Sequence, residues 1–352
     1  MPDLVVAGAG MAGLAAAAEA RGRGADVLLL EKGDRAGGSM LLSSGVVWRH
    51  RTFDAFREEC ADGDPALQRL VFERLDADVD WLVSLGAQVT QPDTGNARTT
   101  GVRFDTRSLT DALLAAAGEP RLGKPLRERP DGAPLVLATG GFQGDRELLR
   151  RHVTPEADHL MLRAAPWSAG DGLRIGLEAG ARSSAGMDQV YGRNMPAPPA
   201  RVGPADFVGL AQLYARHARV ENERGERHDA ATWSEIDVLQ WTARQPRARA
   251  WFTVEEDALD EPVRDRTVRD LVDAAETAGA PVRRGDGTVT VETVAGVTTT
   301  LGGLRIDERA CAAPGVFAAG TDAGGIATGG YSSGLAAALV FGRIAAAAAL
   351  ES

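Results

Sequence analysis

The chain has 352 residues, 44% of them hydrophobic and 25% charged, which is the composition of an ordinary soluble protein and suggests two domains or one large α/β domain with an insertion. Its 39 basic and 49 acidic residues give a net charge of -10. This balance argues against nucleic acid or an anionic membrane surface as the main partner.

Cysteine and histidine usage predicts no metal site. Cys60 and Cys311 lie far apart in the sequence, and the histidines show no metal-ligand spacing. The first apolar run begins at about residue 4, which leaves no room for a signal peptide, so a cytoplasmic location is expected. Residues 334–350 are apolar and alanine-rich, but they form a short stretch interrupted by Arg343, which predicts a buried helix rather than a membrane anchor.

The beginning of the chain carries the most informative pattern. An apolar run at residues 4–7 leads into a glycine turn at 8–13 and an alanine-rich helix. A second apolar run at 27–30 then ends at Glu31. This is the order of elements in a βαβ unit that binds a dinucleotide.

Each glycine of this turn has an expected role. Gly8 permits the tight turn, Gly10 lets the backbone approach a pyrophosphate, and Gly13 lets the helix lie close to the strand. The N–H groups at the start of the helix would face the phosphate charges. Glu31 is placed to accept hydrogen bonds from both hydroxyls of an adenosine ribose.

Further elements follow in chain order. Residues 32–47 and 120–134 read as loops, the second rich in proline, glycine and charge. The spacing of apolar residues and the positions of glycine and proline predict helices over 53–86, 109–117, 144–152 and 173–179. A buried strand is expected from residue 135, ending in a glycine turn at 140–141. The last part of the chain predicts strand-turn-helix segments at 304–307, 315–322 and 334–350.

The middle of the chain has a different character. Between residues 182 and 294, tryptophan, tyrosine, proline and charge become more frequent and apolar strands fewer. This change predicts an inserted α+β domain. The expected fold is therefore α/β, with a Rossmann-like domain at 1–181 and 295–352 and a cap domain at 182–294.

Four motifs in order resemble one family. The chain resembles the FAD-dependent fumarate reductase and succinate dehydrogenase flavoprotein superfamily, most of all the branch of 3-ketosteroid dehydrogenases and tricarballylate dehydrogenase-like proteins. The motifs that carry the resemblance are residues 8–13 with Glu31, the loop Gly37-Gly38-Ser39, the segment 137–141, and residues 315–322 followed by 329–335 and 340–343.

The resemblance implies FAD as the cofactor, bound non-covalently because His50, the histidine nearest the Gly37-Gly38-Ser39 loop, lies outside the attachment pattern of some relatives. The first glycine turn would hold the pyrophosphate, Thr321 or Asp322 a ribitol hydroxyl, and the last helix would point its positive end at the flavin pyrimidine. The full set of implied cofactor-binding residues is Gly8, Gly10, Met11, Ala12, Gly13, Glu31, Lys32, Gly37, Gly38, Ser39, Ser43, Ser44, Gly45, Thr139, Gly140, Asp171, Gly320, Thr321, Asp322, Ser333, Gly334 and Leu335.

Two departures from the family pattern stand out. Fumarate reductases carry a proton-donating arginine a few residues beyond the stretch that here reads Gly225-Glu226-Arg227, but residues 228–235 contain no arginine. Reduction of fumarate itself is therefore doubtful. Residues 120–134 are also shorter than the region in which relatives place a hairpin and part of the adenine site, so adenine contacts are expected to be reduced or rebuilt.

Candidate catalytic residues follow from the chemistry that the resemblance implies. Tyr331 is the first candidate for a base or donor, Arg193 after Tyr191 is placed to bind a carboxylate or enolate, and His228 is a candidate acid or base. The structural alternative for Tyr331 is a tyrosine packed at a loop edge. For Arg193 it is a solvated arginine, and for His228 a surface histidine.

The sequence thus predicts an FAD-dependent oxidoreductase that adds or removes hydrogen across a C–C bond activated by a carbonyl or carboxylate. A small-molecule substrate would lie between the cap and the flavin ring. The electron-exchange partner is not indicated. The alternative is a flavin-binding lyase, isomerase or cyclase without net redox turnover, which the missing arginine favours. A nicotinamide-dependent dehydrogenase is disfavoured because no second Gly-x-Gly-x-x-Gly unit occurs.

Overall fold

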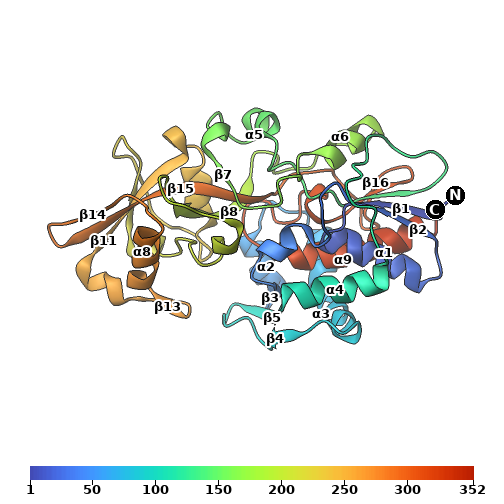
Figure 1. Cartoon of the computed structure of the whole chain (residues 1–352), viewed down its shortest axis with the longest axis horizontal. Coiled ribbons are helices and arrows are strands. Elements are labelled where there is room, and N and C mark those ends of the chain that lie inside the picture. The colour runs from blue at the N-terminus through green and yellow to red at the C-terminus, as the bar shows by residue number, and fades with distance from the viewer. The chain divides into compact units, whose positions relative to one another are not determined.

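The computed structural model describes residues 1–352, and the chain divides into two compact units. Unit 1 contains residues 1–145, 165–189 and 299–352, and unit 2 contains 146–164 and 190–298. Figure 1 shows both ends of the chain in unit 1. The boundaries 1–181, 182–294 and 295–352 stay a prediction about functional domains.

A mainly parallel sheet forms the centre of unit 1. Its strand order is β16-β17-β6-β1-β2, with β16 antiparallel to β17 and the other neighbours parallel. The strands are short and apolar, and β1, β6 and β17 are buried along their whole length, as expected for a parallel sheet. The bounds are β1 Leu4–Ala7, β2 Val27–Leu30, β6 Leu135–Leu137, β16 Cys311–Ala313 and β17 Val316–Ala318.

The helices of unit 1 pack around α1 and α9. Helix α1 lies along both α9 and α4, and α9 also packs on α3 (Figure 1). The bounds are α1 Met11–Gly22, α2 Phe53–Glu59, α3 Pro65–Ser84, α4 Thr106–Ala117, α6 Asp171–Glu178 and α9 Gly334–Ala349, with single turns η1 at Gly38–Leu42 and η7 at Gly320–Asp322. Helix α9 is buried over most of its residues, as the sequence predicted.

The helix predicted over residues 53–86 is wrong in one respect, because it is two helices. Helix α2 ends at Glu59, and α3 begins after a turn in which the Asp64 carboxylate accepts hydrogen bonds from the backbone N–H groups of Ala66 (2.9 Å) and Leu67 (3.2 Å). Pro65 occupies the first helical position, where its missing N–H costs nothing. Aspartate followed by proline is a helix-start signal that the apolar periodicity across the break concealed.

A small antiparallel sheet lies beside these helices. Its strand order is β3-β5-β4, with bounds β3 Val46–His50, β5 Thr99–Phe104 and β4 Val89–Gln91. The loop predicted over residues 32–47 is therefore wrong at its end, because strand β3 begins at Val46. The strand expected at 304–307 is present only as isolated bridges of Leu304 to Ser183 and Ala323.

Unit 2 is built on a second, mainly antiparallel sheet. The order is β10-β9-β11-β15-β14, and β7 and β8 also pair with β15. The bounds of its strands are β7 Met161–Leu162, β8 Val190–Pro196, β9 Arg219–Glu221, β10 Arg227–His228, β11 Arg249–Glu255, β14 Val282–Gly285 and β15 Thr288–Thr300. Strands β12 Pro262–Val263 and β13 Arg266–Thr267 pair with each other in a separate two-stranded sheet. The helices of unit 2 are α5 Arg146–His152, α7 Ile236–Thr242 and α8 Val268–Thr277. Short turns are η2 Ala157–His159, η3 Pro204–Asp206, η4 Ala215–His217, η5 Pro246–Ala248 and η6 Glu256–Asp260.

The core of unit 2 is separate from that of unit 1. Phe252 and Val291 of the sheet and Leu271 of α8 are buried together in one apolar cluster. The parallel sheet of unit 1 and the α+β character of unit 2 confirm the predicted fold class. None of the helices combines the length and the apolar character that a membrane crossing requires.

A partly buried ion cluster joins three helices of unit 1. Arg343 of α9 contacts Glu19 of α1 (Nη2 to Oε2, 2.8 Å) and the Oδ1 of Asp78 of α3. Its guanidinium carbon lies 4.3 Å from the centroid of the Trp81 ring. Burial raises the pKa of the Asp78 carboxyl, whereas Arg343 lowers it, and the second Asp78 oxygen has no partner. Arg343, which interrupts the apolar stretch of α9, therefore pairs with the acidic side chains of Glu19 and Asp78 on the neighbouring helices.

Replacing Arg343→Leu should lower the free energy of unfolding by ~3 kcal/mol, because Asp78 would keep a buried charge without its partner. A carboxyl whose pKa is raised in the folded state destabilises that state when ionised. The loss should therefore shrink as the pH falls towards the ordinary pKa of an aspartate. Urea unfolding over a pH series measures this effect. The double variant with Asp78→Asn should recover part of the loss at neutral pH, and an equal loss with and without Asp78→Asn would contradict the assignment.

Candidate cofactor site

The glycine turn between β1 and α1 contains two kinds of glycine. A Cβ atom on Gly8 would overlap the carbonyl oxygen of Ala138, and one on Gly13 would overlap the carbonyl oxygen of Gly8. Gly8 also has a φ of 103°, which disfavours other residues. A Cβ atom on Gly10 would meet no protein atom within 4 Å. Packing therefore explains Gly8 and Gly13, while Gly10 borders open space.

Helix α1 begins at that open space without a side-chain cap. Gly10 is its N-cap and supplies no acceptor, and the first turn holds no acidic residue. The N–H groups and the positive end of the helix dipole are therefore left for an anion. The open space beside Gly10 leaves room for such an anion next to these N–H groups.

Glu31 shapes the neighbouring turn. Its buried carboxylate accepts hydrogen bonds from the backbone N–H groups of Ala9 (Oε2, 2.7 Å) and Gly33 (Oε1, 2.6 Å). A carboxylate has about four acceptor sites, so capacity remains for ligand hydroxyls. The residue thus fixes the turn and also borders the cavity.

The loop Gly37-Gly38-Ser39 faces the same turn from the other side. The Gly37 N–H donates to the carbonyl oxygen of Ala9 (2.7 Å), and a Cβ on Gly38 would lie 3.2 Å from the Gly10 Cα. The Ser39 hydroxyl oxygen accepts from the N–H of Ala165 (3.0 Å). Its own proton is therefore available to donate into the cavity.

A buried carboxylate, Asp322, holds the turn after β6. It accepts hydrogen bonds from the backbone N–H and the hydroxyl of Thr139 (hydroxyl, 3.1 Å) and from the N–H of Gly141 (3.0 Å). Burial raises the pKa of Asp322, and these donors lower it in part. The carboxylate is occupied inside the protein, and its neighbour Thr321 is the residue that lines the cavity.

The N-terminal turn of α9 completes this group of elements. The Ser333 hydroxyl caps the helix by accepting from the N–H of Ala336 (3.2 Å), and Leu335 lines the cavity. A Cβ on Gly334 would meet no protein atom within 4 Å. The start of α9 is therefore a second uncrowded helix terminus.

One cavity in unit 1 collects most of the predicted cofactor-binding residues. Those that line it are Gly8, Gly10, Met11, Ala12, Glu31, Lys32, Gly38, Ser39, Thr139, Gly140, Asp171, Gly320, Thr321 and Leu335. Those that do not line it are Gly13, Gly37, Ser43, Ser44, Gly45, Asp322, Ser333 and Gly334. Ser43 instead forms a local turn, donating to the carbonyl of Met40 (2.8 Å) and accepting from the N–H of Gly45 (3.1 Å).

Several lining residues were not predicted from the sequence. They are Ala7, Leu30, Met40, Lys124, Leu126, Ala138, Trp167, Ser168, Thr299 and Ala338. Four of them, Ala7, Leu30, Met40 and Ala138, directly neighbour predicted residues, so extending each motif by one position finds these four. Lys124 and Leu126 belong to a loop rich in proline and glycine, and Trp167 precedes the turn into α6, where no local pattern distinguishes a lining residue.

Tyr331 lies near the start of α9 in an aromatic group. Its ring centroid is 5.1 Å from that of Trp48, and its carbonyl oxygen lies 3.2 Å from His50 Nε2. The His50 ring is buried and stacked on Phe56 (5.0 Å between centroids). Burial lowers the pKa of His50, although the bond to Tyr331 opposes this shift. His50 therefore holds the backbone at Tyr331.

The other catalytic candidates belong to unit 2. Arg193 is buried, donates to the carbonyl oxygen of Ser234, and lies over the Tyr191 ring (5.3 Å from guanidinium carbon to centroid). Burial raises the pKa of Glu235, the next residue after Ser234, and Arg193 opposes this shift. Tyr191 and Arg193 are thus brought together, and Arg193 is not a solvated surface arginine.

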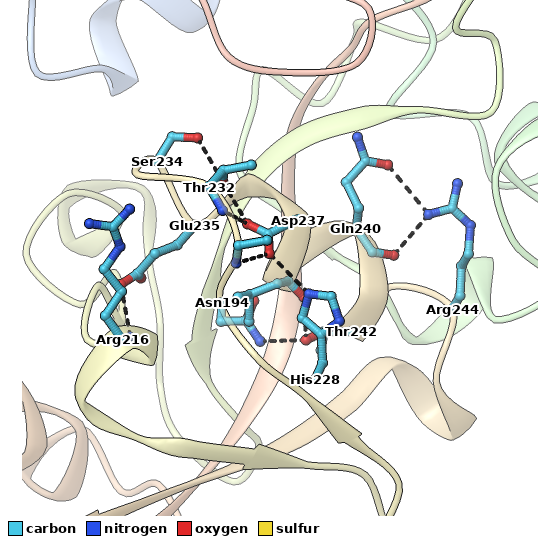
Figure 2. A network of polar contacts seen from close by, with 12 residues as sticks. Asn194, Arg216, His228, Thr232, Ser234, Glu235, Asp237, Gln240, Thr242 and Arg244 are labelled. Carbon is cyan, nitrogen blue, oxygen red and sulfur yellow. Dashed lines mark hydrogen bonds and ion pairs between the residues drawn. The ribbon is translucent and has the colours of Figure 1, made fainter. Parts of the chain in front are cut away.

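His228 forms a separate pair with Asp237. The His228 Nε2 lies 3.0 Å from Asp237 Oδ2, and the imidazole stacks on Trp241 (5.4 Å between centroids). Figure 2 shows that Asp237 also receives hydrogen bonds from Thr232. Burial alone raises the pKa of Asp237, but these donors and His228 bring it below its ordinary value. Asp237 is therefore a fixed anion that orients the imidazole.

Comparisons with known proteins agree with this geometry. A family model described as an FAD binding domain matches residues 3–128 and 126–335. A flavocytochrome c3 fumarate reductase in its open conformation has a TM-score of 0.74 at 20% identity, over 99% of this chain and 78% of that one. A 3-ketosteroid-delta4-(5alpha)-dehydrogenase from Rhodococcus jostii RHA1 has a TM-score of 0.72 at 19% identity, over 100% and 97%.

A sequence relative adds a further comparison. A vinyl phenol reductase from Lactiplantibacillus plantarum is 26% identical over 243 residues, which are 54% of this chain and 48% of that protein. The chain thus spans about half the length of the curated relative that it matches. The Mycobacterium smegmatis Sdh1 structure has a TM-score of 0.70 at 18% identity, over 99% of this chain and 68% of that one. The family model confirms the predicted FAD binding domain, and the solved structures agree with the predicted resemblance in fold.

The residues present fit FAD, which is the cofactor of this family. The open face of Gly10 and the uncapped start of α1 suit the pyrophosphate, and Glu31 suits the ribose hydroxyls. Thr321 and Ser39 suit the ribitol and phosphate region, and the start of α9 suits the electron-rich end of the flavin.

Gly10→Ala should keep the fold and weaken FAD binding, because the added methyl group enters space that only the cofactor would occupy. Its φ of -83° is compatible with alanine. We expect a loss of roughly tenfold in affinity, or about 1.4 kcal/mol. Titration calorimetry with FAD and a thermal melt measure the two properties.

Two further alanine variants serve as controls for Gly10→Ala. Gly22→Ala, at the far end of the same helix and equally uncrowded, should leave FAD binding unchanged and should not lower stability, because alanine is the better helix former. Gly13→Ala should lower stability instead, because its Cβ overlaps backbone. Unchanged FAD affinity in Gly10→Ala would contradict the site.

Proposed function

The chain belongs to the FAD binding domain family, and on this premise we propose that it is an FAD-dependent oxidoreductase that adds or removes hydrogen across a C–C bond activated by a carbonyl or carboxylate. The N-terminal turns of α1 and α9 line one cavity, which is the main support for this proposal. Bound FAD would supply the hydride acceptor or donor for this reaction.

The start of α9 supports the redox assignment. The N–H groups and the positive dipole end at a helix N-terminus stabilise negative charge. In α9, Leu335 of the first turn lines the cavity, and Gly334 leaves space beside this turn because it has no side chain. A helix placed in this way favours the reduced, electron-rich state of a flavin. The names of the relatives, which are reductases and dehydrogenases, support the same class of reaction.

We assign Tyr331 the role of base or proton donor at the activated carbon. Its backbone is held by His50, and its ring is packed on Trp48, so the phenol is fixed on the segment that leads into α9. Removal of hydrogen from a C–C bond requires one hydrogen to leave as a hydride and the other as a proton. The tyrosine would handle the proton.

Arg193 and His228 are proposed to act on the substrate from unit 2. Arg193, with Tyr191 beside it, is proposed to bind a carboxylate or enolate oxygen. His228 has Asp237 at Nε2, which leaves Nδ1 as the atom that exchanges a proton. We propose that residues 182–294 act as the substrate-binding cap and that the substrate is a small molecule. A cytoplasmic location stays a prediction.

We propose that FAD is bound without a covalent link. His50 is buried, stacked on Phe56 and engaged at Nε2 with the Tyr331 carbonyl, so its ring is committed to packing. Acid precipitation of the purified holoprotein should therefore leave the flavin in the supernatant. Flavin that remained in the washed pellet would overturn this part of the proposal.

Anaerobic reduction of the bound flavin tests the proposed reaction. Mixing the holoprotein with saturated ketones or acids that carry an adjacent C–H should bleach the visible flavin absorbance. After chemical reduction, enones or unsaturated acids should restore it. Tyr331→Phe should slow this step by about 100-fold at unchanged flavin content, because it lacks the proton-transfer group.

The control is Tyr214→Phe in the core of unit 2, which should react at the wild-type rate if it folds. A flavin whose spectrum changes with none of these compounds, while a substrate is still converted, would instead support a lyase, isomerase or cyclase. A Tyr331→Phe variant with the wild-type rate would overturn the role of Tyr331.

A further inference from the structure

A second cavity in unit 1 has a volume of about 630 Å³ and shares no lining residue with the cofactor cavity. Its wall is formed by the start of α3, the segment that follows α6, and residues 305–312. The charged residues that line it are Asp64, Arg182, Arg305, Asp307, Glu308 and Arg309. None of them has a part in the cofactor site or in the proposed reaction.

Two of these residues, Arg182 and Arg305, lie directly opposite each other. Ser183 and Leu304 form an isolated antiparallel bridge, and next to it the Arg305 N–H donates to the Arg182 carbonyl oxygen (2.7 Å). Opposite residues of an antiparallel pair place their side chains on the same face, where like charges repel each other. The two guanidinium groups therefore share one face, and both line the cavity.

The other charged groups of the cavity are largely engaged elsewhere. The Asp64 carboxylate caps α3, and Asp307 Oδ1 accepts hydrogen bonds from two backbone N–H groups of its own turn (2.9 Å each). The Arg309 guanidinium pairs with Glu351 near the end of the chain (3.0 Å). Glu308 is the one remaining acid of the cavity, and it is exposed.

The two opposed arginines keep their hydrogen-bond donors available. Both residues are exposed, and neither forms an ion pair with a carboxylate of the chain. Each guanidinium presents a planar fork of N–H groups that matches two oxygens of a phosphate or carboxylate group. An anion bound between Arg182 and Arg305 would therefore replace a repulsion by two charge-assisted contacts.

We infer that Arg182 and Arg305 form a binding site for a small anion with at least two negative charges, carried by phosphate or carboxylate groups. The cavity has the volume of a small-molecule site. All of its residues belong to unit 1, and none of them lines the cofactor cavity. The site is therefore independent of FAD and of the proposed reaction.

Titration calorimetry of the FAD-loaded full chain with inorganic pyrophosphate and with citrate tests this site, because the bound cofactor keeps both anions out of its own cavity. We expect saturable binding of at least one anion, and the tighter of the two identifies the class. Arg182→Gln and Arg305→Gln should each weaken binding roughly tenfold, since each removes a charge-assisted contact. Arg305→Lys, which keeps the charge but not the fork, should lie between Arg305→Gln and the wild type.

Two further variants separate a built site from general attraction of anions. Glu308→Gln removes the remaining acid of the cavity and should strengthen binding at low ionic strength. Arg103→Gln, at an exposed position of β5 outside the cavity, makes the same change in net charge and should bind like the wild type.

The site would be overturned by either of two results. One is that neither pyrophosphate nor citrate binds saturably. The other is that Arg103→Gln weakens binding as much as Arg305→Gln does, which would show attraction by net charge alone. Thermal melts check that the variants are folded, and because the arginines are exposed and repel each other, neither Arg182→Gln nor Arg305→Gln should lower the melting temperature.

Discussion

The structure of unit 1 depends on backbone contacts that only glycine permits. Helix α1 contacts the turn before it because Gly13 has no side chain. It contacts α9 because Gly342 has none either, and a Cβ on Gly342 would overlap the carbonyl oxygen of Ala12. Gly8 likewise lies against Ala138 at the end of β6. These contacts bring the starts of α1 and α9 to one cavity, and every proposed cofactor contact follows from that arrangement.

Two buried carboxylates then give the cavity its shape. Glu31 joins the glycine turn to Gly33 in the loop after β2, and Asp322 joins the turn after β6 to the segment before α9. Both accept hydrogen bonds from backbone N–H groups, which stabilises a buried charge and also fixes the loops. The difference lies in exposure to the cavity, because Glu31 lines it whereas Asp322 is enclosed.

The sequence predicted those parts of the fold whose causes are local. The glycine turn, Glu31 and the final helix each carry a short pattern with one physical meaning, and all three are present where expected. The break between α2 and α3 was missed because the apolar spacing continues across Asp64 and Pro65. Contacts between distant segments leave no local pattern, so the packing of Trp167 on Gly33 and the enclosure of Asp322 emerge only from the fold.

A crystal structure of the full chain grown with FAD tests the central claim, which is that one dinucleotide extends from the start of α1 to the start of α9. We expect the pyrophosphate in front of Gly10, within hydrogen-bond distance of the N–H groups of the first turn of α1, and the flavin at Gly334 and Leu335. Electron density for FAD elsewhere on the chain, or none in this cavity at saturating FAD, would contradict the account.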